Sequence, residues 1–317
     1  CIMRLVQMAG VVPGDRAQMA FGYGMFTGGF GLHYGLQKLG CMMIPAGSGN
    51  TERHIAMIED YGTTVLVATP SYALHVCEVG EKMGYDWAKS PLRVGLFGGE
   101  PCPPGLKAEI ENRMHIVCTD NYGLTEVMGP GVSGECLASR DMQHIAEDHF
   151  LWEVVDPETG EPVPDGEMGE LVLTPLGKQA IPVLRYRTHD LTHVVTEPCA
   201  CGRTTARMQK VRARSDDMLI IRGTNVFPSQ VEDVLAGIDG VTPHYRIVVE
   251  SAGGLDRMTV HVELKPEAFS DSYEDMENLR RSIEDKLKGV LLVGVKAKLV
   301  EPGGIERSTG KTKHVED

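Results

Sequence analysis

Residues 64–83 read TVLVATPSYALHVCEVGEKM, a short apolar run followed by a segment with helical periodicity. The composition of Thr64–Ala68 is typical of a buried strand, and Ser71–Met83, which opens on a serine, is predicted to be a helix. A strand followed directly by a helix is the repeating unit of α/β domains. This stretch therefore predicts an α/β fold for the part of the chain around it.

The same alternation extends in both directions, over residues 1 to about 120. We expect further strands at Ala17–Phe21, Cys41–Ile44, Leu92–Phe97 and Ile116–Thr119, and further helices at Thr27–Leu39, Thr51–Tyr61 and Pro104–Arg113. Alternating strands and helices predict a mostly parallel sheet with helices on both faces.

The rhythm changes twice towards the C-terminus. Residues 150–208 form short strands between Pro/Gly-rich turns, which predicts a β-rich subdomain with strands at Leu151–Val155, Gly169–Thr174 and Leu191–Val195. After Arg214 a β-α-β-β-α-β order follows, which predicts a small α+β domain with a ferredoxin-like arrangement. Its expected elements are Met218–Ile221, Pro228–Ala236, Tyr245–Glu250, Met258–Leu264, Tyr273–Leu287 and Val295–Val300. We therefore expect a large domain over residues 1–214 and a small one over 215–317.

Composition and charge exclude several classes of protein. The 317 residues contain 42% apolar and 24% charged residues, which is typical of globular proteins. No apolar run approaches the ~18 residues that cross a bilayer, and we expect no membrane association. The net charge of −13 disfavours non-specific nucleic-acid binding, although it permits a small anionic ligand held by local cations.

The eight cysteines are too few and too scattered for a disulfide scaffold, which favours a reducing, cytoplasmic location. Cys199 and Cys201 form a C-x-C turn, and Cys136 and His144 lie upstream. Three thiolates and an imidazole match a closed, structural Zn²⁺ site. The alternative is two separate buried thiol pairs, because the spacing is not that of a standard zinc ribbon.

Polar motifs follow several predicted strands. Residues 120–126, DNYGLTE, combine an aromatic residue, a hydroxyl and a carboxylate, which suit a base, a phosphate and Mg²⁺; an ordinary strand-to-turn peptide is the alternative. The residues at 98–101, GGEP, suit either close approach of a ligand or a simple turn. Asp190 could accept hydrogen bonds from a ribose diol, or it could belong to a solvated salt-bridge cluster. Lys311 lies in a tail without apolar periodicity.

Six motifs occur in a specific order: FGYGMFTGG at 21–29, TPSY at 69–72, YGLTE at 122–126, EDHF at 147–150, DDMLIIRG at 216–223 and NVFPSQ at 225–230. This ordered set resembles phenylacetate-CoA ligases of the adenylate-forming superfamily, over nearly the whole chain. The resemblance implies that ATP and an aryl acid form an acyl-adenylate, which coenzyme A then converts to a thioester while AMP leaves. The acid, ATP and coenzyme A would be the partners, and the oligomeric state stays open between monomer and homodimer.

The resemblance also implies roles for individual residues. Residues bordering the adenine would be Gly98, Gly99, Glu100, Pro101, Asn121 and Tyr122. Asp190 and Arg214 would hold the ribose, Thr125 would contact the α-phosphate, and Glu126 would bind Mg²⁺. Asp216 would be the hinge of a mobile small domain, which delivers Lys311 to the carboxylate and α-phosphate in the first step.

Aromatic residues would line the acid pocket. Phe21, Tyr23 and Phe26 would form its wall, with Pro130 and Gly131 near the far side; plain core packing is the alternative for the rings. Phe21 replaces the tyrosine usual in the family, so phenylacetate, hydroxyphenylacetate and indoleacetate all remain candidate substrates.

The chain opens on Cys1 within an apolar helical run, and the family's phosphate loop has no counterpart in it. We therefore expect an N-terminally truncated ligase with an incomplete large domain, which binds nucleotide poorly and turns over slowly. Two alternatives differ in function: a non-catalytic, zinc-stapled relative, and an enzyme that passes its acyl group to a carrier protein. Glu126, Asp190, Arg214 and Lys311 together favour a working enzyme.

Overall fold

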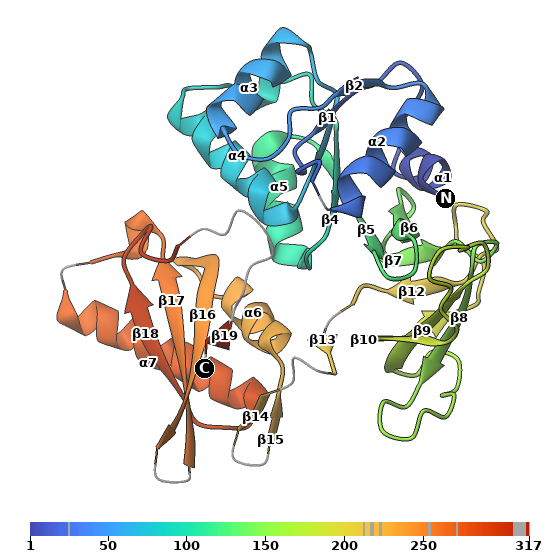
Figure 1. The fold of residues 1–317 in the computed structure, drawn as a ribbon. Coiled ribbons are helices and arrows are strands. Elements are labelled where there is room, and N and C mark those ends of the chain that lie inside the picture. The colour runs from blue at the N-terminus through green and yellow to red at the C-terminus, as the bar shows by residue number, and fades with distance from the viewer. Residues whose placement is uncertain are drawn as a thin grey trace. The chain divides into compact units, whose positions relative to one another are not determined.

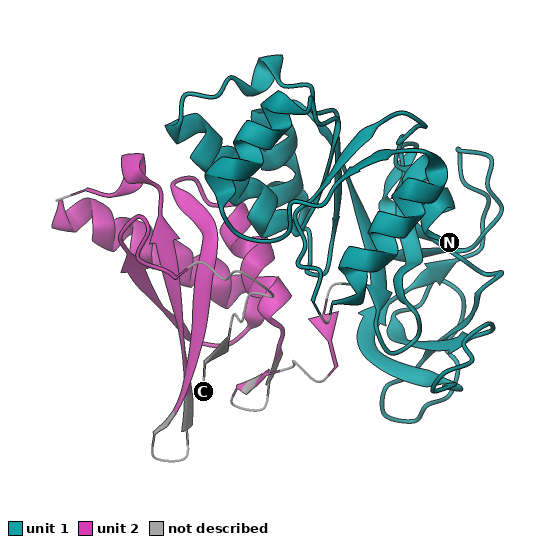
Figure 2. Cartoon of the chain, turned by 45° about the horizontal axis from the view of Figure 1, so that its top comes forward, with its two compact units in different colours: residues 1–212 teal, residues 213–317 magenta. Residues whose placement is uncertain are grey.

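The computed structural model describes residues 1–24, 26–211, 213–215, 219–221, 224–252, 255–270, 272–306 and 315–316. The chain divides into two compact units, residues 1–212 and 213–317 (Figure 2). The boundary predicted at residue 214 lies at the start of the second unit. No helix among the described residues is both long and apolar enough to span a bilayer.

A nine-stranded sheet organises the first unit, in the order β11-β12-β7-β6-β5-β4-β3-β1-β2 (Figure 1). Its parallel half consists of β1 (Arg16–Met19), β2 (Met42–Ile44), β3 (Val65–Ala68), β4 (Val94–Gly98) and β5 (Val117–Leu124). The helices between and before these strands are α1 (Ile2–Met8), α2 (Thr27–Leu39), α3 (Thr51–Asp60), α4 (Pro70–Lys82) and α5 (Pro104–Met114), with a 3₁₀ turn, η1, at Trp87–Lys89. The predicted alternation of strands and helices is confirmed.

The two faces of this sheet bury different helices. Val65 and Val67 of β3 pack in one cluster with residues of α1 and α2. Leu66 and Ala68 of the same strand pack in another cluster with residues of α3, α4 and α5. Because successive side chains of a strand point to opposite faces, the sheet has helices on both sides, as predicted.

The other half of the large sheet is antiparallel, so the expectation of a mostly parallel sheet holds only for β1–β5. It consists of β6 (Gly129–Cys136), β7 (Ser139–Ile145), β12 (Arg207–Gln209) and β11 (Val194–Val195). The composition of β6, GPGVSGEC, is unusual for a strand. Its glycines make room for the helix above: a Cβ on Gly134 would lie 2.7 Å from Cγ of Leu5.

The β-rich region contributes three antiparallel strands to a separate sheet: β8 (Phe150–Val155), β9 (Gly169–Pro175) and β10 (Tyr186–Thr192). The predicted strand Leu191–Val195 is divided, because β10 ends at Thr192 and β11 begins at Val194 in the other sheet. The predicted subdomain over 150–208 therefore contributes strands to both sheets.

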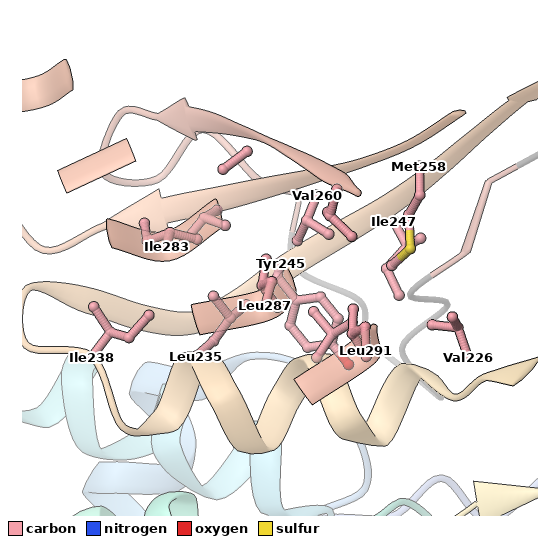
Figure 3. Packing of buried hydrophobic residues seen from close by; sticks show 14 of the residues in the cluster. Val226, Leu235, Ile238, Tyr245, Ile247, Met258, Val260, Ile283, Leu287 and Leu291 are labelled. Carbon is pink, nitrogen blue, oxygen red and sulfur yellow. The ribbon is translucent and has the colours of Figure 1, made fainter. Parts of the chain in front are cut away.

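The second unit contains a four-stranded sheet in the order β18-β17-β16-β19. Its elements are β13 (Ala213–Arg214), β14 (Leu219–Ile221), β15 (Thr224–Val226), α6 (Pro228–Ala236), β16 (Val241–Ala252), β17 (Leu255–Leu264), η2 (Pro266–Ala268), α7 (Tyr273–Leu291), β18 (Val295–Val300) and β19 (Val315–Glu316). Both helices pack on one face of this sheet, where Leu235 of α6 and Leu287 of α7 meet Tyr245 and Ile247 of β16 (Figure 3).

The small unit has the predicted order of helices and strands, but its topology differs from the ferredoxin-like expectation. In that arrangement the first strand lies inside the main sheet. Here β14 pairs with β15 in a two-stranded sheet, and β18 pairs directly with β17. Only two residues separate β14 from β15, a connection short enough for a hairpin, so the first strand has a local partner.

Candidate active site

The predicted nucleotide residues follow the carboxyl ends of neighbouring parallel strands, where open α/β sheets usually bind ligands. Gly98 ends β4 and pairs with Asn121 of β5. The Asn121 amide donates a hydrogen bond to the carbonyl of Phe97, which fixes the side chain against β4. A Cβ on Gly98 would lie 2.7 Å from the Asn121 carbonyl oxygen, so only glycine fits here. Gly99 has a φ of +83°, which also favours glycine.

Glu100 connects the end of β4 to the start of α4. Its Oε1 accepts a 2.7 Å hydrogen bond from the backbone N–H of Ser71, within the first turn of the helix. Its Oε2 is buried without a partner among the described residues. Burial raises the pKa of Glu100, while the contacts with Ser71 and Thr69 act in the opposite direction. This side chain therefore positions a helix end beside the predicted adenine slot.

Tyr122 and Asp190 connect the two sheets of the first unit. The Tyr122 hydroxyl donates a 2.5 Å hydrogen bond to Oδ2 of Asp190. The Asp190 side chain is only 8% exposed, and its backbone N–H donates to the hydroxyl of Thr188 at 3.1 Å. The structure thus brings together a residue predicted at the adenine and one predicted at the ribose.

Thr125 and Glu126 follow β5 and are exposed. The Thr125 hydroxyl is 2.9 Å from that of Thr27, the first residue of α2. The backbone carbonyl of Glu126 accepts a hydrogen bond from Nζ of Lys178. Sequence reasoning did not find Lys178, because it lies in a loop without a recognisable motif. Thr27 could have been identified from the sequence, because it belongs to the FGYGMFTGG motif.

Two of the predicted aromatic residues form a pair beside the nucleotide residues. The rings of Phe21 and Phe26 are 5.2 Å apart and inclined at 59°. A Cβ on Gly99 would lie 3.8 Å from Cζ of Phe26. Phe26 is 41% exposed, so its ring provides an apolar surface next to the end of β4.

The remaining predicted pocket residues contact α1 and α2. Tyr23 packs edge-on against Phe30 and His33, and its hydroxyl is 2.9 Å from Nδ1 of His33. Burial raises the pKa of Tyr23 to about 12, so this phenol stays protonated. The ring of Pro130 lies against Gly31 of α2, and Gly131 lies against Ile2 of α1.

Three further predicted residues belong to the second part of the chain. Arg214 ends β13, within the second unit. Asp216, the predicted hinge, and Lys311, the predicted catalytic lysine, lie outside the described residues.

The four predicted zinc ligands converge, although they come from distant parts of the first unit. The ligand atoms of Cys136, His144, Cys199 and Cys201 all lie within 4.8 Å of one another. The Sγ atoms of Cys136 and Cys199 are 3.8 Å apart, and Sγ of Cys201 is 3.4 Å from Nε2 of His144. A tetrahedral site with Zn–S bonds of 2.3 Å requires sulfur atoms about 3.8 Å apart. The structure therefore does not support two separate thiol pairs.

The imidazole of His144 is oriented for this cluster. Its Nδ1 is 2.9 Å from the hydroxyl of Thr205, which leaves Nε2 facing Cys201. Burial, together with the charges of Arg203 and Arg207, lowers the pKa of His144. A lowered pKa favours the neutral ring, which is the form that binds metals.

Comparison with known proteins places the chain among adenylate-forming enzymes. The AMP-binding enzyme family matches residues 6–176, and the AMP-binding enzyme C-terminal domain matches residues 223–317. A solved 2-hydroxyisobutyryl-CoA ligase, in the postadenylation state with an acyl-AMP, has a TM-score of 0.93 at 28% identity, covering 100% of this chain and 68% of that one.

Curated relatives are similar over the full length of the chain. The phenylacetate-coenzyme A ligase of Aromatoleum evansii is 45% identical over 100% of this chain and 72% of its own length. That of Escherichia coli K12 is 43% identical over the same shares. The chain belongs to the phenylacetate-CoA ligase family of AMP-binding, adenylate-forming enzymes.

Proposed function

We propose that this protein joins an aryl carboxylic acid to coenzyme A in an ATP-dependent reaction with an acyl-adenylate intermediate. The observation that carries the proposal is the hydrogen bond between Tyr122 and Asp190. This hydrogen bond supports the proposal because it joins the aromatic residue that we assign to the adenine to the buried carboxylate that we assign to the ribose hydroxyls, and Asn121, next to Tyr122, pairs with Gly98 at the end of β4.

In the first step, an oxygen of the acid attacks the α-phosphorus of ATP and pyrophosphate leaves. Asn121 and the glycine backbone at 98–99 border the adenine, and the Thr125 hydroxyl contacts the α-phosphate. Lys311 bridges the attacking carboxylate and the α-phosphate, where a cation offsets developing charge. In the second step, the thiol of coenzyme A attacks the acyl carbon and AMP leaves, after rotation of the small domain about Asp216.

The acid binds beside this nucleotide site. The inclined pair of Phe21 and Phe26 offers an apolar surface suited to a flat aryl group. Phe26 is also adjacent to Gly99, which would put the acid's ring close to the end of β4. We propose phenylacetate or a close arylacetic analogue as the substrate, because an apolar wall offers no partner for a highly polar ring.

A magnesium ion fits the residues after β5. Glu126 has an exposed carboxylate, and Thr125 provides a hydroxyl; hard oxygen ligands of this kind suit Mg²⁺. When bound, the ion neutralises charge on the phosphate oxygens.

A zinc ion fits the cluster of Cys136, His144, Cys199 and Cys201. Four protein ligands close the coordination sphere, so the ion would be structural. It would connect the β6–β7 hairpin to the turn after β11, at the far end of the large sheet from β2. Elemental analysis tests this directly: about one zinc per chain supports the site, and metal-free protein purified without chelators refutes it.

The function is tested by two assays over a panel of aryl acids. Acid-dependent ATP–pyrophosphate exchange measures the first step, and thioester formation with coenzyme A measures the second. If none of the acids supports exchange, the non-catalytic alternative is favoured. Exchange without coenzyme A thioester, but with acylation of a carrier protein, would favour the carrier-directed alternative.

A further inference from the structure

Three long polar side chains stand in one row across the sheet of the second unit. Arg246 of β16 is paired with His261 of β17, and His261 is paired with Lys298 of β18. The three strands are adjacent in the sheet (Figure 1). Directly paired residues on neighbouring strands point to the same face, so the three side chains are neighbours.

This row lies on the face of the sheet opposite the helices. The next residues along the strands, Tyr245, Val260 and Ala297, are buried in the core under α6 and α7. Since side chains alternate between faces, Arg246, His261 and Lys298 point away from that core.

The row opens into a hollow of about 420 Å³. Phe269, which is 47% exposed, lines it together with Glu301 and the turn at Gly304 and Ile305. The turn is held in place by the buried Glu263, whose Oε2 accepts a 3.1 Å hydrogen bond from the backbone N–H of Ile305. The wall of the hollow is therefore built and anchored by the sheet itself.

Arg246 and Lys298 lie on either side of His261, so the row places two cations and an imidazole on one face of a sheet in a chain whose net charge is −13. We propose that the hollow binds the phosphate of a phosphorylated nucleoside, with Arg246, His261 and Lys298 around the phosphate and Phe269 against the base. Arginine and lysine are suited to phosphate oxygens, and an exposed aromatic ring is suited to a flat base.

The size of the hollow is consistent with such a ligand. Strands lie about 4.8 Å apart, so side chains on three neighbouring strands can converge on one phosphate. A volume of 420 Å³ is within the range of small-ligand pockets. The nucleoside could come from coenzyme A or from ATP, which carry the same chemistry.

Hydrogen–deuterium exchange of the whole chain, with and without ligand, locates the site. Adenosine 3′,5′-bisphosphate, which is the nucleotide end of coenzyme A, should protect the segments at 258–270 and 295–305. Protection by coenzyme A and the bisphosphate, but not by ATP, assigns the site to coenzyme A; protection by ATP alone assigns it to ATP. No protection of these segments by any of the three overturns the proposal, whatever the outcome of the ligase assays.

Matched variants test the residues. Lys298→Met should weaken binding of the bisphosphate by about tenfold, because a charge-assisted contact is lost. Lys296→Met is the control: it removes the same charge from the same face of β18, two positions away, and should leave binding within about twofold. Equal effects of the two variants would overturn the site. Phe269→Leu should weaken the bisphosphate more than inorganic phosphate, and equal weakening would overturn the role of the ring.

Discussion

The hydroxyl of Tyr122 donates a 2.5 Å hydrogen bond to Asp190, a residue 68 positions further along the chain. The bond joins β5 of the large sheet to β10 of the smaller one, and it orients a carboxylate that is only 8% exposed. Because each partner has a proposed nucleotide contact, their mutual orientation should matter more for ATP than for the acid.

Tyr122→Phe should therefore raise the KM for ATP by about tenfold, since a hydrogen bond to a charged group contributes about 1.5–3 kcal/mol. The KM for the acid should change little. Steady-state ATP–pyrophosphate exchange at varied ATP and varied acid separates the two. Tyr34→Phe, on an exposed residue of α2, is the control for loss of a tyrosine hydroxyl. If the KM for ATP were unchanged in Tyr122→Phe, the hydrogen bond between Tyr122 and Asp190 would no longer support the proposed function.

Glu135 is at the centre of a buried ion cluster in the first unit. Its Oε2 is 2.6 Å from Nζ of Lys107 and its Oε1 is 2.7 Å from Nζ of Lys210, with the Glu135 side chain fully buried. Glu135→Gln removes the carboxylate that both buried ammonium groups contact and should lower the free energy of unfolding by about 3 kcal/mol.

Denaturant unfolding followed by far-UV circular dichroism measures this loss. Asp148→Asn removes a carboxylate from a 2.8 Å pair with Arg4, in which both side chains are about half exposed, and should cost less than about 1 kcal/mol. Similar losses in the two variants would show that burial does not determine the strength of these pairs.

Local patterns in the sequence predicted the first half of the large sheet well. The helix at Thr27–Leu39 was predicted with the bounds it has, because its apolar residues recur at helical spacing and Gly40 ends it. By contrast, β6 was missed, because its glycines and proline disfavour a strand locally. Its conformation depends on packing against Leu5, a tertiary contact that no local pattern contains.

The candidate site was only partly predictable for the same reason. The ligand types of Cys136, His144, Cys199 and Cys201 indicated zinc, but their convergence depends on the pairing of β7 with β12. The contact between Glu100 and Ser71 joins residues 29 positions apart, so no motif showed that this carboxylate holds a helix end. The first strand of the small unit was predicted at the right residues, but its pairing was not, because its partner, β15, is too short to show periodicity.

Asp120 should make stability depend on pH. Burial raises the pKa of this carboxyl to about 7, with Lys210 acting in the opposite direction. An unfolded aspartate has a pKa of about 3.9. The folded state therefore retains a proton that the unfolded state releases, so this contribution to stability is complete below about pH 4 and is lost as pH rises through about 7.

Asp120→Asn keeps the neutral shape at every pH. The free energy of unfolding of the wild type minus that of Asp120→Asn should accordingly fall between about pH 4 and pH 7 and level off at higher pH, measured by urea unfolding at each pH. Parallel stability curves for the two proteins would show that Asp120 ionises normally in the fold.

Thr205 should control metal affinity without touching the metal. Its hydroxyl is 2.9 Å from Nδ1 of His144 and fixes the ring with Nε2 towards Cys201. Loss of such an outer contact usually weakens metal binding by about 10–100-fold. Thr205→Val should thus lose zinc at lower chelator concentrations than the wild type, with zinc release followed by a chromogenic indicator.

Cys199→Ser, which removes a ligand, should lose the metal altogether, whereas Cys1→Ser, outside the cluster, should behave as the wild type. If Thr205→Val retained zinc as tightly as the wild type, the hydroxyl would have no orienting role.

Gly98 should matter for both the fold and the nucleotide site, because both require a residue without a Cβ at this position. A Cβ there would lie 2.7 Å from the backbone oxygen of Asn121, on the neighbouring strand, and neither backbone can move without breaking the pairing of β4 with β5. Gly98→Ala should cost about 2 kcal/mol of stability and should also weaken ATP binding, because Asn121 is displaced. Gly289→Ala, on the exposed side of α7 with nothing within 4 Å, should instead raise stability by about 0.5–1 kcal/mol. Thermal unfolding and ATP titration of both variants check the contrast. If Gly98→Ala had normal stability and normal ATP binding, the backbone at the end of β4 would be able to shift without breaking its pairing with β5.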